Sequence, residues 1–209
     1  AKRIAQKNGE YVGSTAPYGY CVEKINGIYK LMVEPEAAKI VRRIFEEYAS
    51  GDGIQSIIDR LFEDRVHRIS DYNQYHHVYC QDGENLHQWG NSSIRAVLNR
   101  NNYYGDLVQR KYESRFQRGE KWCDILDESQ WIITPNAHEP IISRELFEKA
   151  QVRLKAAQQK ATKTTAGWED DERAFYNVFY CGDCKRKMCT RRYRGNVYYF
   201  CNAAWYRDE

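Results

Sequence analysis

The residues best suited to chemistry are three cysteines near the C-terminal end of the sequence. Cys181 and Cys184 form a C-x2-C knuckle, and sixteen residues separate Cys184 from Cys201. A knuckle followed at that spacing by a second cysteine pair is typical of a zinc ribbon. Thiolates are preferred zinc ligands, and a closed structural site uses about four ligands. The spacing therefore predicts a structural zinc site with Cys181, Cys184 and Cys201 as three of its ligands.

The spacing leaves the fourth ligand of this site open. Ala204 stands where the second pair should be completed, and the last histidine of the sequence is His138. Cys189 is one alternative, although we expect it on the strand that leaves the knuckle. The other alternative is a cysteine beyond Glu209, which would leave the zinc site of this chain incomplete or empty. On that interpretation the sequence is a piece of a longer protein.

The other cysteines and the histidines predict no second metal centre. Cys21, Cys80 and Cys123 are isolated, which indicates a reducing compartment with one metal cluster rather than a disulfide framework. The segment 65–90 is rich in histidine, but its spacing matches no zinc pattern, and surface histidines are the expected interpretation. These histidines are His67, His76, His77 and His87. No catalytic residue is assigned, and the absence of a carboxylate cluster at nuclease spacing disfavours a metal-dependent nuclease.

Positive charge gathers in two segments, although the net charge of the 209 residues is only +3. Residues 185–194 hold six cations and no acid, and residues 95–121 hold seven cations against three acids. An acidic stretch, 123–148, separates them. This distribution suits a protein with one nucleic-acid face, and a solvated charge run is the alternative. The candidates for DNA contact are Lys2, Arg3, Lys7, Ser92, Ser93, Arg95, Asn99, Arg100, Arg110, Lys111, Arg115, Arg118, Lys185, Arg186, Arg191, Arg192 and Arg194.

Turn and cap signals divide the chain into elements that would position these residues. Asn26-Gly27 between two β-forming runs predicts a hairpin over 18–33, and Pro35 predicts a helix start with an end at Gly51. Further helices are expected from Gly53 to Phe62, from Asn91 or Ser92 to Leu98, and from Ser143 toward Gln159. Segment 65–90 is expected to be a long loop, and 103–112 and 131–134 are expected to be strands.

These elements predict an α+β chain. No membrane span is expected, because no apolar run approaches about 18 residues. The first domain would be a helix-turn-helix core with an enlarged connection, and the second a small β zinc ribbon. The expected boundaries are 1–10 for the end of a connecting helix, 11–159 for the DNA-binding domain, 160–173 for a polar linker and 174–209 for the ribbon. Ser92, Ser93, Arg95, Ala96 and Asn99 would face outward on the third helix. Such side chains suit base edges and phosphates in a major groove.

The order of these segments resembles the large serine recombinases, the group of integrases and transposon resolvases, over nearly the whole chain. The matching pieces begin with Gly9 to Gly13, Pro17-Tyr18-Gly19-Tyr20, and Val33-Glu34-Pro35-Glu36 followed by Ile44-Phe45 and Gly51. They continue with Trp89, Ser92, Ile94, Val97-Leu98-Asn99, Tyr103-Tyr104-Gly105, His138 to Ser143, Leu146-Phe147, Cys181 to Cys184 and Tyr199-Phe200-Cys201.

The resemblance implies a recombinase domain and a zinc ribbon that together grip a DNA half-site. In that family a resolvase-like domain with the serine nucleophile comes first, so it would lie upstream of Ala1 and be absent from this chain. A coiled-coil insertion that joins protomers would follow Glu209. The implied partners are double-stranded DNA and, for the full-length protein, further copies of itself, with no membrane and no small-molecule substrate.

We therefore expect the DNA-binding portion of a site-specific recombinase that integrates or excises a mobile element, such as a prophage or transposon. Its expected location is the bacterial cytoplasm, on DNA. The alternative is a nucleic-acid-binding regulator that combines a helix-turn-helix with a zinc ribbon and has no link to strand exchange. A resolvase-type domain in the full-length gene would distinguish the two.

Overall fold

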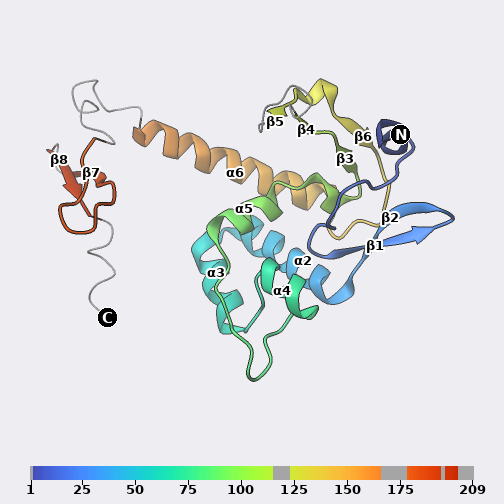
Figure 1. Cartoon of the computed structure of the whole chain (residues 1–209), viewed down its shortest axis with the longest axis horizontal. Coiled ribbons are helices and arrows are strands. Elements are labelled where there is room, and N and C mark those ends of the chain that lie inside the picture. Colours follow the sequence, from blue (N-terminus) through green and yellow to red (C-terminus); the bar gives the residue numbers. More distant parts are fainter. Residues whose placement is uncertain (1, 115–122, 166–177, 194–195, 202–209) are drawn as a thin grey trace. The chain divides into compact units, whose positions relative to one another are not determined.

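The computed structural model describes residues 2–114, 123–165, 178–193 and 196–201, and divides the chain into two compact units, 1–155 and 156–209 (Figure 1). Within these residues, six α-helices combine with four two-stranded antiparallel sheets, which agrees with the predicted mixture of helices and small sheets. No described helix has the length and apolar character needed to cross a membrane. The expected domain boundaries at 160 and 173 stay a prediction.

Three helices that pack on one another form the centre of the first unit. They are α2 (Pro35–Ser50), α3 (Ile54–Glu63) and α5 (Asn91–Leu98). The Glu34 side chain caps α2 by accepting a hydrogen bond from the Ala37 amide at 2.8 Å, and Gly51 ends the helix, as predicted. The apolar face of α2 supplies Ile44 and Phe45, both fully buried, to the shared core. The N-cap of α5 is Gly90, which corrects the predicted cap of Asn91 or Ser92.

The predicted hairpin is confirmed as β1 (Tyr20–Ile25) and β2 (Ile28–Val33), which pair in antiparallel register. Asn26 and Gly27 both have positive φ, 51° and 84°, as a two-residue turn of this type requires. Before the hairpin, the turn from Pro17 to Tyr20 closes through a backbone hydrogen bond of 2.9 Å. Figure 1 shows the hairpin extending away from the helical group.

Segment 65–90 is not a structureless loop, which corrects the sequence prediction. It contains α4 (Ile69–Tyr75), whose Ile69 and Tyr72 pack against the core. Asp71 is buried in the same helix and accepts hydrogen bonds from Arg68 and His87. The helix was missed because only two of its seven residues are apolar and packed, so local propensity is too weak to predict it.

The strand expected at 131–134 is confirmed, while the strand expected at 103–112 is confirmed only at 107–109 and at 112, and further short elements lie around them. In chain order the elements are η1 (Asn101–Tyr104), β3 (Leu107–Gln109), β4 (Tyr112–Ser114), β5 (Cys123–Ile125), η3 (Glu128–Gln130) and β6 (Ile132–Thr134). β3 pairs with β6, and β4 pairs with β5. Tyr103 belongs to a 3-10 helix instead of a strand, because its ring enters the core and its hydroxyl donates to the Tyr18 carbonyl at 2.9 Å. Helix α1 (Lys2–Lys7), at the N-terminal end of the chain, also contacts β6.

Helix α6 (Arg144–Thr165) begins as predicted, with the Ser143 hydroxyl accepting a hydrogen bond from the Leu146 amide at 3.2 Å. It continues six residues past the predicted end, through the first part of the predicted linker 160–173. Lys160, Ala161 and Lys163 in that stretch favour helix, although its other three residues are threonines. In the second unit, β7 (Cys189–Tyr193) pairs with β8 (Asn196–Phe200), and Tyr180 forms an isolated bridge with Lys187.

Stability of the first unit should fall in mild acid because of His138. Burial lowers the pKa of His138, against the opposing effects of its hydrogen bond to the Asn102 carbonyl and of the Asp106 charge. The unfolded chain therefore takes up a proton near pH 6.5 before the folded chain does. The free energy of unfolding should decrease from about pH 7 to about pH 5.5, and His138→Gln should make that decrease smaller. Urea unfolding at the two pH values measures the difference, and equal decreases for both proteins would refute the assignment.

Candidate nucleic-acid interface

Helix α5 presents a polar face to solvent. Ser92, Arg95, Ala96 and Asn99 are exposed, as the sequence predicted, while Ser93, which was also expected to face outward, is half-buried. The opposite face holds the helix in place, because Ile94, Val97 and Leu98 are buried in the core.

Two hydrogen bonds order the exposed face of α5. The Arg95 guanidinium donates to the Asn91 side chain at 3.4 Å, and the Asn99 amide group donates to the Arg95 carbonyl at 2.8 Å. Arg95 keeps most of its donors free for an external acceptor, because a guanidinium carries five. The helix therefore offers a row of short polar side chains with one arginine near its middle.

A depression of about 620 Å³ adjoins the C-terminal end of α5. Its walls come from three segments far apart in the sequence: residues 6–17 before the hairpin, residues 96–102 from α5 into η1, and residues 108–112 from β3 into β4. We call it the Arg100 depression after the exposed arginine at its edge. It brings together four of the predicted contact residues, namely Asn99, Arg100, Arg110 and Lys111.

The Arg100 depression is positively charged. Arg100, Arg110 and Lys111 line it, and none of its lining residues is acidic. Burial lowers the pKa of Lys111, and the nearby positive charge of Arg100 lowers it further. The Lys111 ammonium lies 4.7 Å from the centre of the Trp131 ring and forms a cation–π contact with it. Two cations held this close would each gain from an anion between them.

The wall of the depression formed by residues 10–13 is fixed by a strand side chain that sequence reasoning missed. Gln109 on β3 is buried, donates to the Glu10 carbonyl at 2.9 Å and accepts from the Val12 amide at 3.2 Å. The ring of Tyr11 packs against Gly13, where any side chain would collide with it, because a Cβ added at residue 13 would lie 2.3 Å from the Tyr11 hydroxyl oxygen. A lone glutamine in a short strand gives no sequence signal for such a role.

The cations of the N-terminal segment are partly neutralised. Arg3 pairs with Glu113 at 2.7 Å, and Arg110 reaches the same carboxylate at 3.4 Å. Lys7 is exposed at the end of α1. The side chain of Lys2 lies outside the described residues, as do Arg115 and Arg118 in full. Among the described residues neither Arg100 nor Lys111 forms an ion pair with a carboxylate, although the charge of Glu128 opposes the lowering of the Lys111 pKa.

In the second unit, Cys181, Cys184 and Cys201 converge as the spacing predicted. Their sulfur atoms all lie within 4.8 Å of one another, and Cys184 and Cys201 are 3.3 Å apart. Backbone N–H groups of Cys184 and Asp183 lower the pKa of the Cys181 thiol to about 7, and contacts with the other two thiols lower it as well. Three thiols in this arrangement fit a thiophilic metal ion. Cys189 lies on β7 outside the cluster, which favours a fourth ligand from elsewhere.

Two predicted basic residues flank this knuckle. Lys185 and Arg186 are exposed, and the backbone of each is bonded to Cys181, by Lys185 N–H to the Cys181 carbonyl at 3.0 Å and by Cys181 N–H to the Arg186 carbonyl at 2.8 Å. A bound metal would therefore also help to hold the backbone of these two residues in place. Arg194 and the side chains of Arg191 and Arg192 lie outside the described residues.

The histidines of segment 65–90 are not all surface groups, which corrects the sequence interpretation. His67 is fully buried, while His76 is exposed and His77 is half-buried. His67 and His77 both contact Glu84. No spacing or periodicity in the segment indicates these contacts, because they depend on the folded path of the whole segment.

Comparison with known proteins places most of the first unit in a described family. A family model named Recombinase matches residues 35–157, more than half of the 209 residues. The chain is similar to one in a crystal structure of an LSR–DNA complex, with 17% identity and a TM-score of 0.46, over 99% of this chain and 54% of that one. It is also similar to one from a study of the sequence requirements of the Listeria innocua prophage attP site, with 18% identity and a TM-score of 0.47, over 100% and 74% of the two chains. The chain thus spans about half the length of the first of these structures.

Proposed function

The chain belongs to the Recombinase family, and from that premise we propose that it is the DNA-binding part of a site-specific serine recombinase. In this role it binds one half of an attachment site during integration or excision of a mobile element. In this proposal the chain itself supplies neither the catalytic serine nor the contacts between protomers. The resemblance of the ordered motifs to large serine recombinases supports this assignment.

The observation that carries the proposal is that the Arg100 depression directly adjoins the polar face of α5, at the C-terminal end of the helix. In our proposal Ser92, Ser93, Arg95 and Asn99 enter the major groove, where arginine and asparagine read guanine and adenine edges. Arg100 and Lys111 then hold a phosphate of the flanking backbone, a contact that fixes register without reading sequence. Lys2, Arg3 and Lys7 follow the backbone or minor groove nearer the crossover point.

The second unit is proposed to be a zinc ribbon that contacts an outer part of the same half-site. Cys181, Cys184 and Cys201 would hold the zinc, whose role is structural because thiolate sites of this kind stabilise the fold. Lys185, Arg186, Arg191, Arg192 and Arg194 would face DNA. Two tethered units gain affinity through effective concentration, so deleting the ribbon should cost more than its isolated affinity suggests.

Metal binding by the knuckle can be tested with cobalt(II) as a spectroscopic substitute for zinc. We expect an intense thiolate-to-cobalt charge-transfer band in the reduced chain, and loss of that band in Cys184→Ser. Cys189→Ser is the matched control and should keep the band, because Cys189 lies outside the cluster. A band that survives Cys184→Ser, or that Cys189→Ser abolishes, would contradict the assigned ligands.

The proposed function is tested by selecting duplexes from a random pool with the purified chain at moderate salt. Enrichment of one motif over several rounds is the expected result, with specific binding at least about a thousandfold tighter than random duplex. Binding without enrichment would leave only a generic nucleic-acid-binding protein. The regulator alternative would be favoured if the motif occurred at promoters and the full-length gene had no resolvase-type domain.

A further inference from the structure

Segment 65–80 folds back on itself just after α3. Val66 and Tyr79 form an antiparallel bridge, the His67 amide donates to the Val78 carbonyl at 2.8 Å, and the Cys80 amide donates to the Arg65 carbonyl at 2.8 Å. This pairing places the side chains of His67 and His77 beside each other, with ring centres 5.4 Å apart. The turn that follows carries Glu84 back toward both rings.

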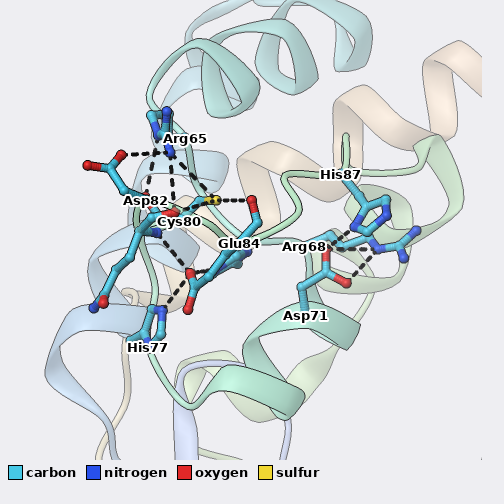
Figure 2. A network of polar contacts seen from close by, with 10 residues as sticks. Arg65, Arg68, Asp71, His77, Cys80, Asp82, Glu84 and His87 are labelled. Carbon is cyan, nitrogen blue, oxygen red and sulfur yellow. Dashed lines mark hydrogen bonds and ion pairs between the residues drawn. The ribbon is translucent and has the colours of Figure 1, made fainter.

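The two imidazoles and the carboxylate meet at one point, and Figure 2 shows the contact between His77 and Glu84. Nε2 of His67 lies 3.0 Å from Oε2 of Glu84, and Nε2 of His77 lies 2.9 Å from the same oxygen. The three donor atoms all lie within 4.8 Å of one another. The side chain of His67 is fully buried, and those of Glu84 and His77 are 17% and 31% exposed. The site is therefore shielded but reachable from solvent on the His77 side.

Hydrogen bonding alone satisfies this arrangement poorly. The Gln81 amide also donates to Oε2 of Glu84, at 2.8 Å, so three donors converge on a single carboxylate oxygen. Such an oxygen has about two lone-pair directions. The other nitrogen of His67, Nδ1, has no hydrogen-bond partner among the described residues, so Nε2 is the one polar anchor of this buried ring.

We propose that His67, His77 and Glu84 form a second metal site, which binds a divalent transition ion and suits zinc best. Two imidazole nitrogens and one carboxylate are a recognised zinc donor set that leaves one coordination position open. A cation there would accept the lone pairs of both Nε2 atoms and one carboxylate oxygen, and Gln81 would keep its hydrogen bond to Glu84. The stacked ring of Tyr75, 5.0 Å from the ring centre of His67, holds that imidazole in orientation.

The site would stabilise the segment that leads into α5. The segment 65–90 connects α3 to α5, and Trp89 is buried just before the helix begins. Zinc bound to the folded chain alone shifts the unfolding equilibrium by mass action, and the shift grows with the ratio of free zinc to its dissociation constant. The metal would thus hold in place the helix whose exposed face carries Ser92 to Asn99.

The test uses the full chain with Cys181→Ser and Cys184→Ser, so that zinc bound at the knuckle does not interfere. Metal analysis after equilibration with excess zinc and gel filtration should give about one zinc per chain. Adding His77→Ala or Glu84→Gln should reduce it to near zero and abolish the rise in melting temperature caused by zinc. His76→Asn is the matched control, because His76 is exposed, sits at a left-handed C-cap that asparagine tolerates, and lies outside the cluster.

The outcome is decided by zinc content in variants that keep their helical circular dichroism. If the background chain binds no zinc, or if His77→Ala and Glu84→Gln bind as much as His76→Asn, the site does not exist. His77→Ala replaces a half-buried residue, so it should fold even if His67 variants do not. The result is independent of DNA binding, and failure of either proposal leaves the other standing.

Discussion

Arg100→Ala should weaken binding of the selected duplex by about 10- to 100-fold, the range expected for loss of one charge-assisted hydrogen bond. The slope of log affinity against log salt should become shallower by about 0.9, since one phosphate contact is lost. Lys111→Ala should act in the same direction, and the double variant should make the slope shallower by the same amount of about 0.9, because both cations are proposed to hold one phosphate. Base preference should stay unchanged, because phosphate contacts carry no sequence information. Fluorescence anisotropy titrations between low and moderate salt measure all of these quantities.

The physical reason is the state of these two cations in the free protein. Burial lowers the pKa of Lys111, and repulsion from the nearby Arg100 charge lowers it further. A bound phosphate removes that repulsion as well as forming new bonds. Lys39→Ala is the matched control, because Lys39 is an exposed cation on α2 paired with Glu36 and lies outside the depression. Equal losses in affinity for Lys39→Ala and Arg100→Ala would show that only net charge matters.

Gly19→Ala should destabilise the first unit strongly, by about 2–5 kcal/mol. Gly19 has φ of +91°, where an alanine is strained by about 1–2 kcal/mol. Its added Cβ would also lie 2.9 Å from Ile141 Cδ1, 3.0 Å from Val41 Cγ2 and 3.5 Å from Ala38 Cα. Overpacking a well-filled core costs about a further 1–3 kcal/mol. Urea unfolding followed by circular dichroism measures the free energy of unfolding of the variant.

Gly27→Ala separates the contribution of backbone strain at positive φ from the contribution of overpacking. Gly27 has a similar φ of +84°, but no atom lies within 4 Å of the position of its added Cβ. It should therefore lose only the conformational part, about 1–2 kcal/mol. If both variants lost the same free energy, close packing around Gly19 would not contribute.

The parts of the fold that sequence could predict are those set by local chemistry. Asn26-Gly27 requires positive φ at both positions and therefore predicts the hairpin. Pro35 and Gly51 delimit α2, and Ser143 caps α6, because helix ends need specific residues to satisfy backbone groups. The three cysteines could be assigned for a similar reason, since metal-ligand spacing is a short-range constraint.

The parts that could not be predicted depend on contacts between distant segments. The Arg100 depression needs residues 6–17, 96–102 and 108–112 to meet, and Gln109 fixes one wall through two backbone groups about a hundred positions away in the sequence. The buried His67 contacts Glu84, which follows α4 in the sequence. Tyr103 forms part of a 3-10 helix because its ring is needed in the core. None of these contacts follows from periodicity.

The central claim is that the exposed face of α5 enters the major groove of a specific duplex. A photoreactive p-benzoylphenylalanine in place of Ser92 tests it most directly, with the same residue in place of exposed Glu46 on α2 as control. The account predicts crosslinks from position 92 to bases inside the selected motif, lost when the motif is scrambled, and none from position 46. Crosslinks from position 46 alone, or equal crosslinking of position 92 to motif and scrambled duplex, would contradict it.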